Sequence, residues 1–286
     1  MLKISDFELY SIVTGTIALD GGAMYGVVPK VLWSKVEEVD ELNRVRIAMR
    51  TLLAINKKTG CVMVIDGGAG DKWPQNELDR YAIENRPHAI SDTLKRLSVS
   101  KESVTDVILT HLHFDHVGGF SYSNERGETL PTFPCARHWI HEGHWRHANA
   151  PTERDRASFL KRDLAFLHTS NLLRFVTGDN PEPTLKGVEW FVSNGHTPYM
   201  LLPIFKGETF DLMFAGDLIP NANQLNPAWS MSYDLFPLTI LSERKEVLKR
   251  CLETGMRLAF PHDMKMAGAA VMFDGRRYSV KEALDF

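Results

Sequence analysis

The densest group of chemically capable side chains lies in the segment DVILTHLHFDHVGG, residues 106–119. Four possible metal ligands occur there within six positions: His111, His113, Asp115 and His116. They directly follow the apolar run 107–109, which predicts a short buried strand. In α/β sheets, ligands and catalytic groups commonly lie just beyond the carboxyl ends of strands. This density of imidazole and carboxylate groups therefore predicts a metal site rather than a chance cluster of solvated histidines.

Three further residues have the same placement after predicted strands. They are His196 in SNGHTP, Asp217 in LMFAGD and His262 in RLAFPHD. Taken singly, a histidine there is more often a hydrogen-bonded structural residue, and the aspartate could form a turn or cap. Because strand ends of one sheet meet at one edge, we expect all three to join the first cluster. The expected site then contains five histidines and two aspartates.

The charges of these ligands favour hydrolytic chemistry. If the site holds two divalent ions, Asp115 and Asp217, the candidate catalytic residues, would neutralise part of their charge while the histidines bind as neutral groups. Zinc lowers the pKa of bound water to about 7, so a metal-bound hydroxide is expected to attack a carbonyl carbon or, alternatively, a phosphorus. Asp217 could also accept a proton after the attack. Zinc is the expected metal, with iron as the open alternative.

The segments that must position these residues read as strands first, then strands alternating with helices. We predict strands at 7–13, 50–56, 61–65, 107–109, 188–192, 212–215 and 258–261, helices at 89–97, 155–175 and 243–253, and turns at 19–22 and 57–60. Ser91 is expected to cap the first helix, and the Pro-containing stretch 178–183 predicts a surface loop. This order favours a layered α/β fold with sheets between helices. With no repeat or linker visible, residues 1–286 are expected to form one domain.

Composition narrows the function classes. Of the 286 residues, 44% are hydrophobic and 24% are charged, and the net charge of -3 offers no basic field for a nucleic acid. No apolar run is long enough to predict a membrane span, and the first residues lack a signal-peptide pattern, so a cytoplasmic location without membrane partners is expected. Cys61, Cys135 and Cys251 contain no CxxC pair and are expected to be small buried residues.

A second histidine group lies at residues 136–149. It contains His138, His141, His144 and His147, but not the HExxH spacing of a zincin. The spacing would align three imidazoles on one helix face, and we interpret them as pocket-lining or solvated. Three nearby aromatic residues could wall an acyl pocket or pack in the core: Trp139, Trp145 and Phe159. Neither GxSxG nor GxGxxG occurs, so serine and dinucleotide chemistry are unsupported.

In order, HxHxDH at 111–116, GHTP at 195–198, GD at 216–217 and PH at 261–262 resemble the metallo-β-lactamase superfamily. The resemblance covers residues 66–262 and implies a four-layer αββα sandwich with two metal ions at one edge. It implies one metal bound by His111, His113 and His196, and a second bound by Asp115, His116 and His262, with Asp217 bridging them. Asp66, in VIDGG, would orient the site groups from behind.

Residues 19–33, LDGGAMYGVVPKVLW, are similar to quorum-quenching hydrolases of the N-acyl-homoserine lactone lactonase type. This implies a small lactone or ester substrate and a homodimer. Two departures are Pro220, where those lactonases carry a substrate-contacting tyrosine, and Tyr199-Met200 after GHTP. Asp217, where true β-lactamases usually carry Cys or Ser, argues against β-lactam hydrolysis. The alternatives are phosphotriester or arylester hydrolysis by the same metal pair, or a low-turnover binding or sensor protein.

Overall fold

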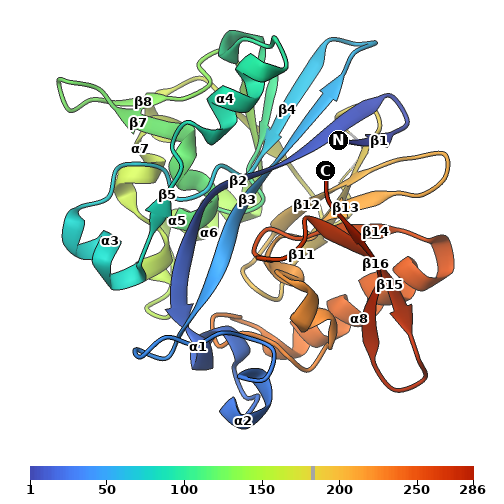
Figure 1. Ribbon diagram of the computed structural model, residues 1–286. Coiled ribbons are helices and arrows are strands. Elements are labelled where there is room, and N and C mark those ends of the chain that lie inside the picture. Colours follow the sequence, from blue (N-terminus) through green and yellow to red (C-terminus); the bar gives the residue numbers. More distant parts are fainter. Residues whose placement is uncertain (182–183) are drawn as a thin grey trace.

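The structure, a computed structural model, describes residues 1–181 and 184–286 and contains two large β-sheets (Figure 1). The first sheet consists of β1 (Leu2–Ile4), β2 (Phe7–Asp20), β3 (Arg44–Asn56), β4 (Cys61–Ile65), β6 (Asp106–Ile108), β9 (Arg137–His141) and β10 (Leu173–Val176), in that order, with β5 (Glu84–Asn85) beside β2. The second consists of β11 (Val188–Ser193), β12 (Met200–Phe205), β13 (Leu212–Phe214), β14 (Arg257–Ala259), β15 (Gly268–Phe273) and β16 (Tyr278–Leu284). A small hairpin joins β7 (Ser121–Ser123) to β8 (Thr129–Pro131).

The direction of the strands places the loop after β4, which contains Asp66, and the loop after β6, which contains the HxHxDH motif, at one edge of the first sheet. Strands β4, β6, β9 and β10 run parallel to one another. The residues after β4 and β6 therefore emerge on the same side, and Asp66 N donates a hydrogen bond to Ile108 O there (3.1 Å).

The second sheet delivers its candidate ligands in the same way. Strands β13 and β14 are parallel. Strand β11 is antiparallel to β12, which is antiparallel to β13, so β11 also points in that direction. His196, Asp217 and His262 consequently all follow strand ends on one edge of this sheet.

The described residues form eight α-helices, which are α1 (Gly21–Tyr25), α2 (Lys30–Trp33), α3 (Gln75–Tyr81), α4 (Ala89–Arg96), α5 (Phe114–Val117), α6 (Glu142–Asn149), α7 (Lys161–Thr169) and α8 (Pro237–Thr254). Helices α4, α6 and α7 pack on the outer face of the first sheet and α8 on that of the second. One apolar cluster lies between the sheets and includes Leu52 and Phe205. A second joins the first sheet to α4 and α7, and a third joins the second sheet to α8. The predicted αββα layering is therefore confirmed.

Several sequence-based element boundaries are wrong. The first strand does not end near residue 13, because β2 shifts register between Val13 and Gly15 and continues pairing with β3 as far as Asp20. The turn predicted at 19–22 does end a strand, since β2 stops at Asp20 and α1 begins at Gly21. The predicted helix 155–175 is restricted to α7, since residues 173–176 pair with β9 as a strand. Ser91 is not a cap: it lies inside α4 and its hydroxyl donates to His88 O (2.9 Å).

Other expectations had mixed outcomes. The hairpin turn at 57–60 is present, with Gly60 N donating to Asn56 O (2.9 Å). The loop predicted at 178–183 includes residues 182–183, which lie outside the described residues. Cys251 is buried, but Cys61 is only partly buried and Cys135 is exposed, so the expectation of three buried thiols is wrong. Within the described ranges, none of the helices has the length and apolar character needed to span a bilayer.

Candidate metal centre

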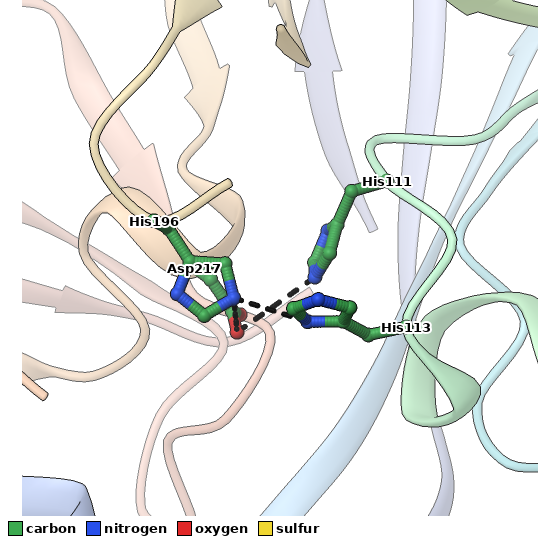
Figure 2. A group of neighbouring side chains, drawn as sticks. All are labelled: His111, His113, His196 and Asp217. Carbon is green, nitrogen blue, oxygen red and sulfur yellow. Dashed lines mark hydrogen bonds and ion pairs between the residues drawn. The ribbon is translucent and has the colours of Figure 1, made fainter. Parts of the chain in front are cut away.

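The structure brings all seven predicted ligands together where the two sheets meet. The loop after β6 carries His111 and His113, and the short helix α5 that follows carries Asp115 and His116. Three loops of the second sheet supply His196, Asp217 and His262. Figure 2 shows four of these side chains pointing toward one another, with His111 and His113 on one loop and His196 and Asp217 on two others.

The first group consists of His111, His113, His196 and Asp217, all buried. One potential ligand atom of each lies within 4.8 Å of those of the others. His196 Nε2 is 3.2 Å from His113 Nδ1 and 3.2 Å from Asp217 Oδ2, while His111 Nε2 is 3.9 Å from that oxygen (Figure 2). Nitrogen and carboxylate atoms gathered in this way match the ligands that zinc takes in proteins.

The second group consists of Asp115, His116 and His262, whose potential ligand atoms also lie within 4.8 Å of one another. Asp217 reaches this group as well, because its Oδ1 is 3.0 Å from His262 Nε2 and 3.3 Å from His116 Nε2. One carboxylate therefore faces the first group with Oδ2 and the second with Oδ1. This is the geometry needed for a ligand shared by two cations.

Hydrogen bonds on the outer side of the site assign the tautomers of four histidines. In each, the outward Nδ1 faces an oxygen: His116 to Asp66 Oδ2 (2.7 Å), His196 to Asp234 Oδ1 (2.9 Å), His262 to Ala48 O (2.7 Å) and His111 to Thr110 Oγ1 (3.0 Å). The first three oxygens can only accept, and the Thr110 hydroxyl gives its own proton to Asp66. Each Nδ1 is therefore the donor, and each neutral ring directs an unprotonated Nε2 inward.

These inward lone pairs require a cation. His262 Nε2 and His116 Nε2 are only 3.2 Å apart, with no proton between them when both rings are neutral. Within the described part of the chain, His111 Nε2 and Asp217 Oδ1 are buried without a hydrogen-bond partner. Buried polar atoms seldom remain unsatisfied. The donor set and its orphaned atoms therefore fit divalent metal ions.

The electrostatics of the metal-free cluster point the same way. Burial and the neighbouring imidazoles of His116 and His113 hold the pKa of His111 well below its usual value. Burial also disfavours a charge on His116, but the carboxylates of Asp217 and Asp115 outweigh it and raise the pKa of His116 well above its usual value. Burial opposes ionisation of Asp217, yet His116 and His262 hold its pKa well below the ordinary range. A proton on His116 thus supplies positive charge that a metal ion would supply instead.

Asp66 lies behind the site, as predicted from the sequence. It accepts hydrogen bonds from His116 Nδ1 and from the hydroxyl (2.9 Å) and backbone N–H (3.0 Å) of Thr110. Partners of this kind fix the tautomer and orientation of a metal-binding ring.

Three supporting residues escaped the sequence analysis. Asp234 holds His196 Nδ1, although it follows no predicted strand. Two buried arginines hold backbone carbonyls beside ligands: Arg244 donates to Leu218 O (2.6 Å), and Arg50 donates to Phe260 O (3.0 Å) and Asp263 O (2.6 Å). The only available signal was an arginine within an apolar run, as in RTLLAIN, which also reads as an ordinary strand end.

A cavity of about 330 Å³ opens onto the two groups and is lined by His113, Asp115, His196, Asp217 and His262. Its remaining wall combines apolar and polar residues. The apolar ones are Leu19, Met24, Ile47, Phe114, Ala157 and Met231, and the polar ones are Tyr81, Arg154, Asp155, Ser158, Ser232 and Tyr233. Partial burial raises the pKa of Tyr233 to about 12, so its hydroxyl stays protonated at neutral pH. Pro220 is not part of the lining.

The second histidine group is not part of this cavity. His138, His141 and His144 are buried, and His138 and His141 belong to β9 rather than to a helix. The pocket-lining or solvated interpretation is therefore wrong for these three residues. Trp139, Trp145 and Phe159 do not line the cavity either, and the core-packing alternative holds for them.

Comparison with known proteins agrees with this geometry. Residues 51–285 match the family model described as metallo-beta-lactamase superfamily. A solved structure described as a probable metal-dependent hydrolase from Staphylococcus aureus is 26% identical, covers 99% of this chain and 100% of its own, and has a TM-score of 0.85. The hydrolase AbOPH (20% identity, TM-score 0.78) and the dizinc quorum-quenching lactonase AidC with the product N-hexanoyl-L-homoserine (18%, TM-score 0.77) each cover 100% of this chain and 97% of their own. No curated protein sequence matches the chain.

Proposed function

The chain belongs to the metallo-beta-lactamase superfamily and is a metal-dependent hydrolase, and from that premise we propose that it uses two zinc ions to hydrolyse lactones or related esters. The proposal assigns His111, His113 and His196 to one ion and Asp115, His116 and His262 to the other. Asp217 binds both.

One observation carries the two-metal proposal. The carboxylate of Asp217 faces both ligand groups, and the Nε2 atoms of four histidines point inward toward it. A single zinc ion, which usually takes about four ligands, could not use all seven side chains, whereas two ions with one bridging carboxylate would use them all.

When bound, zinc supplies Lewis acidity, lowering the pKa of a coordinated water to about 7 and polarising a carbonyl oxygen. The protein's own residues fix the geometry. Asp66 and Asp234 hold two rings in the tautomer that leaves Nε2 free, and Asp115, at the cavity wall, is the more exposed of the two carboxylate ligands. Its position gives it contact with the substrate side of the site.

The cavity supports a substrate that combines a polar reacting group with an apolar substituent. Met24, Ile47 and Met231 form an apolar wall suited to an acyl chain, next to the ligand atoms. Tyr233, whose hydroxyl remains protonated at neutral pH, could donate a hydrogen bond to a carbonyl oxygen, a role that Pro220 cannot fill. The fold shared with a dizinc lactonase adds support for this substrate class.

A substrate panel tests the proposal. Purified zinc-loaded protein would be assayed on N-acyl-homoserine lactones, simple lactones, aryl esters and phosphotriesters, with metal content measured on the same samples. We expect two zinc ions per chain and lactone turnover that depends on acyl length. Turnover of phosphotriesters alone would replace the lactone assignment, and two bound metals without turnover of any substrate would favour a binding or sensor protein.

A further inference from the structure

His144 lies in α6, outside both ligand groups, and is completely buried. Its ring lies between two loops of the metal centre. Nε2 is 2.9 Å from the backbone nitrogen of Leu112, and Nδ1 is 2.8 Å from the backbone oxygen of Pro198. One imidazole therefore forms hydrogen bonds with a ligand loop of the first sheet and with a ligand loop of the second.

The two partners determine the state of this ring. The Leu112 N–H can only donate, so Nε2 must accept, and the Pro198 carbonyl can only accept, so Nδ1 must carry the proton. His144 is thus a neutral imidazole with a single defined tautomer, satisfied at both nitrogens. Neither a protonated ring nor the other tautomer could make both hydrogen bonds.

The two contacts lie directly beside ligands. Leu112 separates His111 from His113, and Pro198 follows two positions after His196. These three histidines all belong to the first ligand group. The His144 ring centroid is 6.1 Å from that of His111, and His144 is not grouped with the atoms that could hold a metal.

We propose that His144 is a positioning residue, which locks the loops carrying His111, His113 and His196 in the arrangement that binds the first metal ion. The role rests on the proposed dinuclear site. It gives a function to one member of the second histidine group, which the hydrolytic chemistry does not otherwise use. The second ligand group, Asp115, His116 and His262, has no contact with the His144 hydrogen bonds, so the effect of His144 is confined to one of the two metals.

His138 provides a matched control. It is also a completely buried histidine, and its Nδ1 lies 3.0 Å from a backbone oxygen, that of Ala136. It lies on β9, and within the described residues it makes no hydrogen bond to a ligand loop. Replacing it removes a buried imidazole without touching the metal loops.

The test measures the two zinc dissociation constants by chelator competition in His144→Ala, His144→Gln, His144→Asn and His138→Gln. Supporting partners of metal ligands typically contribute about 10–100-fold in affinity. We expect His144→Ala to weaken the binding of one zinc ion by that factor and to leave the affinity for the other unchanged. Gln, which can accept from Leu112, and Asn, which can donate to Pro198, should each retain part of the affinity. His138→Gln should lower the melting temperature while binding both ions like the wild type.

Wild-type zinc affinities in the His144 variants, or an equal loss in His138→Gln, would overturn the proposal. A second readout is independent of metal: hydrogen exchange at the Leu112 amide, followed by NMR in leucine-labelled protein. The amide should exchange at least 10-fold faster in His144→Ala than in the wild type, and unchanged exchange would also contradict the role. If the wild type bound no metal while His144 still slowed hydrogen exchange at the Leu112 amide, the proposed dinuclear function would fail. Only the role of His144 in holding the two loops together would then stand.

Discussion

Asp217 is the residue on which both ligand groups depend, because its two oxygens face different groups. Replacing Asp217 with Ala removes a ligand from each metal. We expect zinc content to fall below two per chain and lactone turnover to fall by more than about 100-fold, beyond the 10–100-fold typical of a supporting residue. Metal analysis and steady-state kinetics on the same preparation measure both effects.

Asp163 is the control for this substitution. It is also a buried carboxylate, paired with Lys72 Nζ at 3.1 Å, but it belongs to neither ligand group. Asp163→Asn should reduce stability and keep two zinc ions. Full activity and two metals in Asp217→Ala would rule out the bridging role.

Asp234 supports His196 through a carboxylate that uses both oxygens. Oδ1 accepts from His196 Nδ1 (2.9 Å) and Oδ2 accepts from Met231 N (2.8 Å). Asparagine has only one acceptor oxygen, so Asp234→Asn leaves one of these N–H groups without a partner. We predict about 10–100-fold weaker binding of one zinc ion, measured by chelator competition.

Asp106→Asn is the comparison, because Asp106 is equally buried and accepts from Trp139 Nε1 (2.7 Å) and Arg137 at the other end of β6. It should lose stability without a change in zinc affinity. Indistinguishable zinc affinities in Asp234→Asn and the wild type would show that this carboxylate does not support the site.

The seven ligand positions could be predicted from the sequence because each stands next to, or shortly after, an apolar run that ends at the same edge. Asp234 could not, because it follows no strand and reaches His196 through a loop whose path depends on the whole fold. His144 was visible as a histidine, but its partners are backbone groups, which no side-chain pattern reveals.

At the scale of elements, two glycine-containing turns allow the loops after β4 and β6 to touch through their backbones. A Cβ added to Gly118 would lie 2.1 Å from Ala69 O, and one added to Gly119 would lie 2.0 Å from Gly67 O. In the same contact, Gly67 N donates to His116 O (2.6 Å). The loop holding Asp66 and the loop holding His116 can approach this closely only without side chains.

Gly118→Ala should therefore separate these loops. We expect the free energy of unfolding to fall by about 1–3 kcal/mol, the usual cost of forcing extra atoms into a packed interior. Urea unfolding of metal-free protein measures it. Gly127→Ala, in a hairpin with open space and a φ of +77°, should cost only about 1–2 kcal/mol of backbone strain and leave zinc binding intact. Normal zinc affinity in Gly118→Ala would show that the close contact is not needed for the site.

Elements with a simple apolar pattern were predictable, and those defined by pairing were not. Strand β12 was missed, although all its residues are buried, because Pro203 cannot donate to a ladder and normally argues against a strand. Pro203 lies opposite Trp190 in the pairing with β11, while on its other side β12 pairs with β13 only at Ile204 and Phe205. Strands β15 and β16 were missed because much of their surface is exposed, which weakens the alternating pattern.

At the scale of the whole molecule, the proposed metals join two sheets. The first sheet's loops supply His111, His113, Asp115 and His116, and those of the second supply His196, Asp217 and His262. Each ion bound only in the folded state stabilises it by mass action, by about 2.7 kcal/mol at a hundredfold excess over its dissociation constant, so two ions contribute about 5 kcal/mol. Chelation should also leave the inward-facing histidine nitrogens and carboxylate oxygens from both sheets without a metal ion between them.

We therefore expect removal of both ions to lower the melting temperature by about 10–20 °C, using roughly 2–4 °C per kcal/mol for a chain of this size. Differential scanning calorimetry before and after chelation measures the shift, and added zinc should restore the original value whereas added magnesium should not. A melting temperature insensitive to chelation would mean that the sheets are not joined by metal. The single domain, the homodimer and the cytoplasmic location remain predictions.

Anomalous diffraction at the zinc edge from crystals of the zinc-loaded protein tests the central claim most directly. We predict two peaks per chain, one among His111, His113 and His196 and one among Asp115, His116 and His262, with the carboxylate of Asp217 between them. A single peak, or peaks away from these side chains, would contradict the dinuclear site.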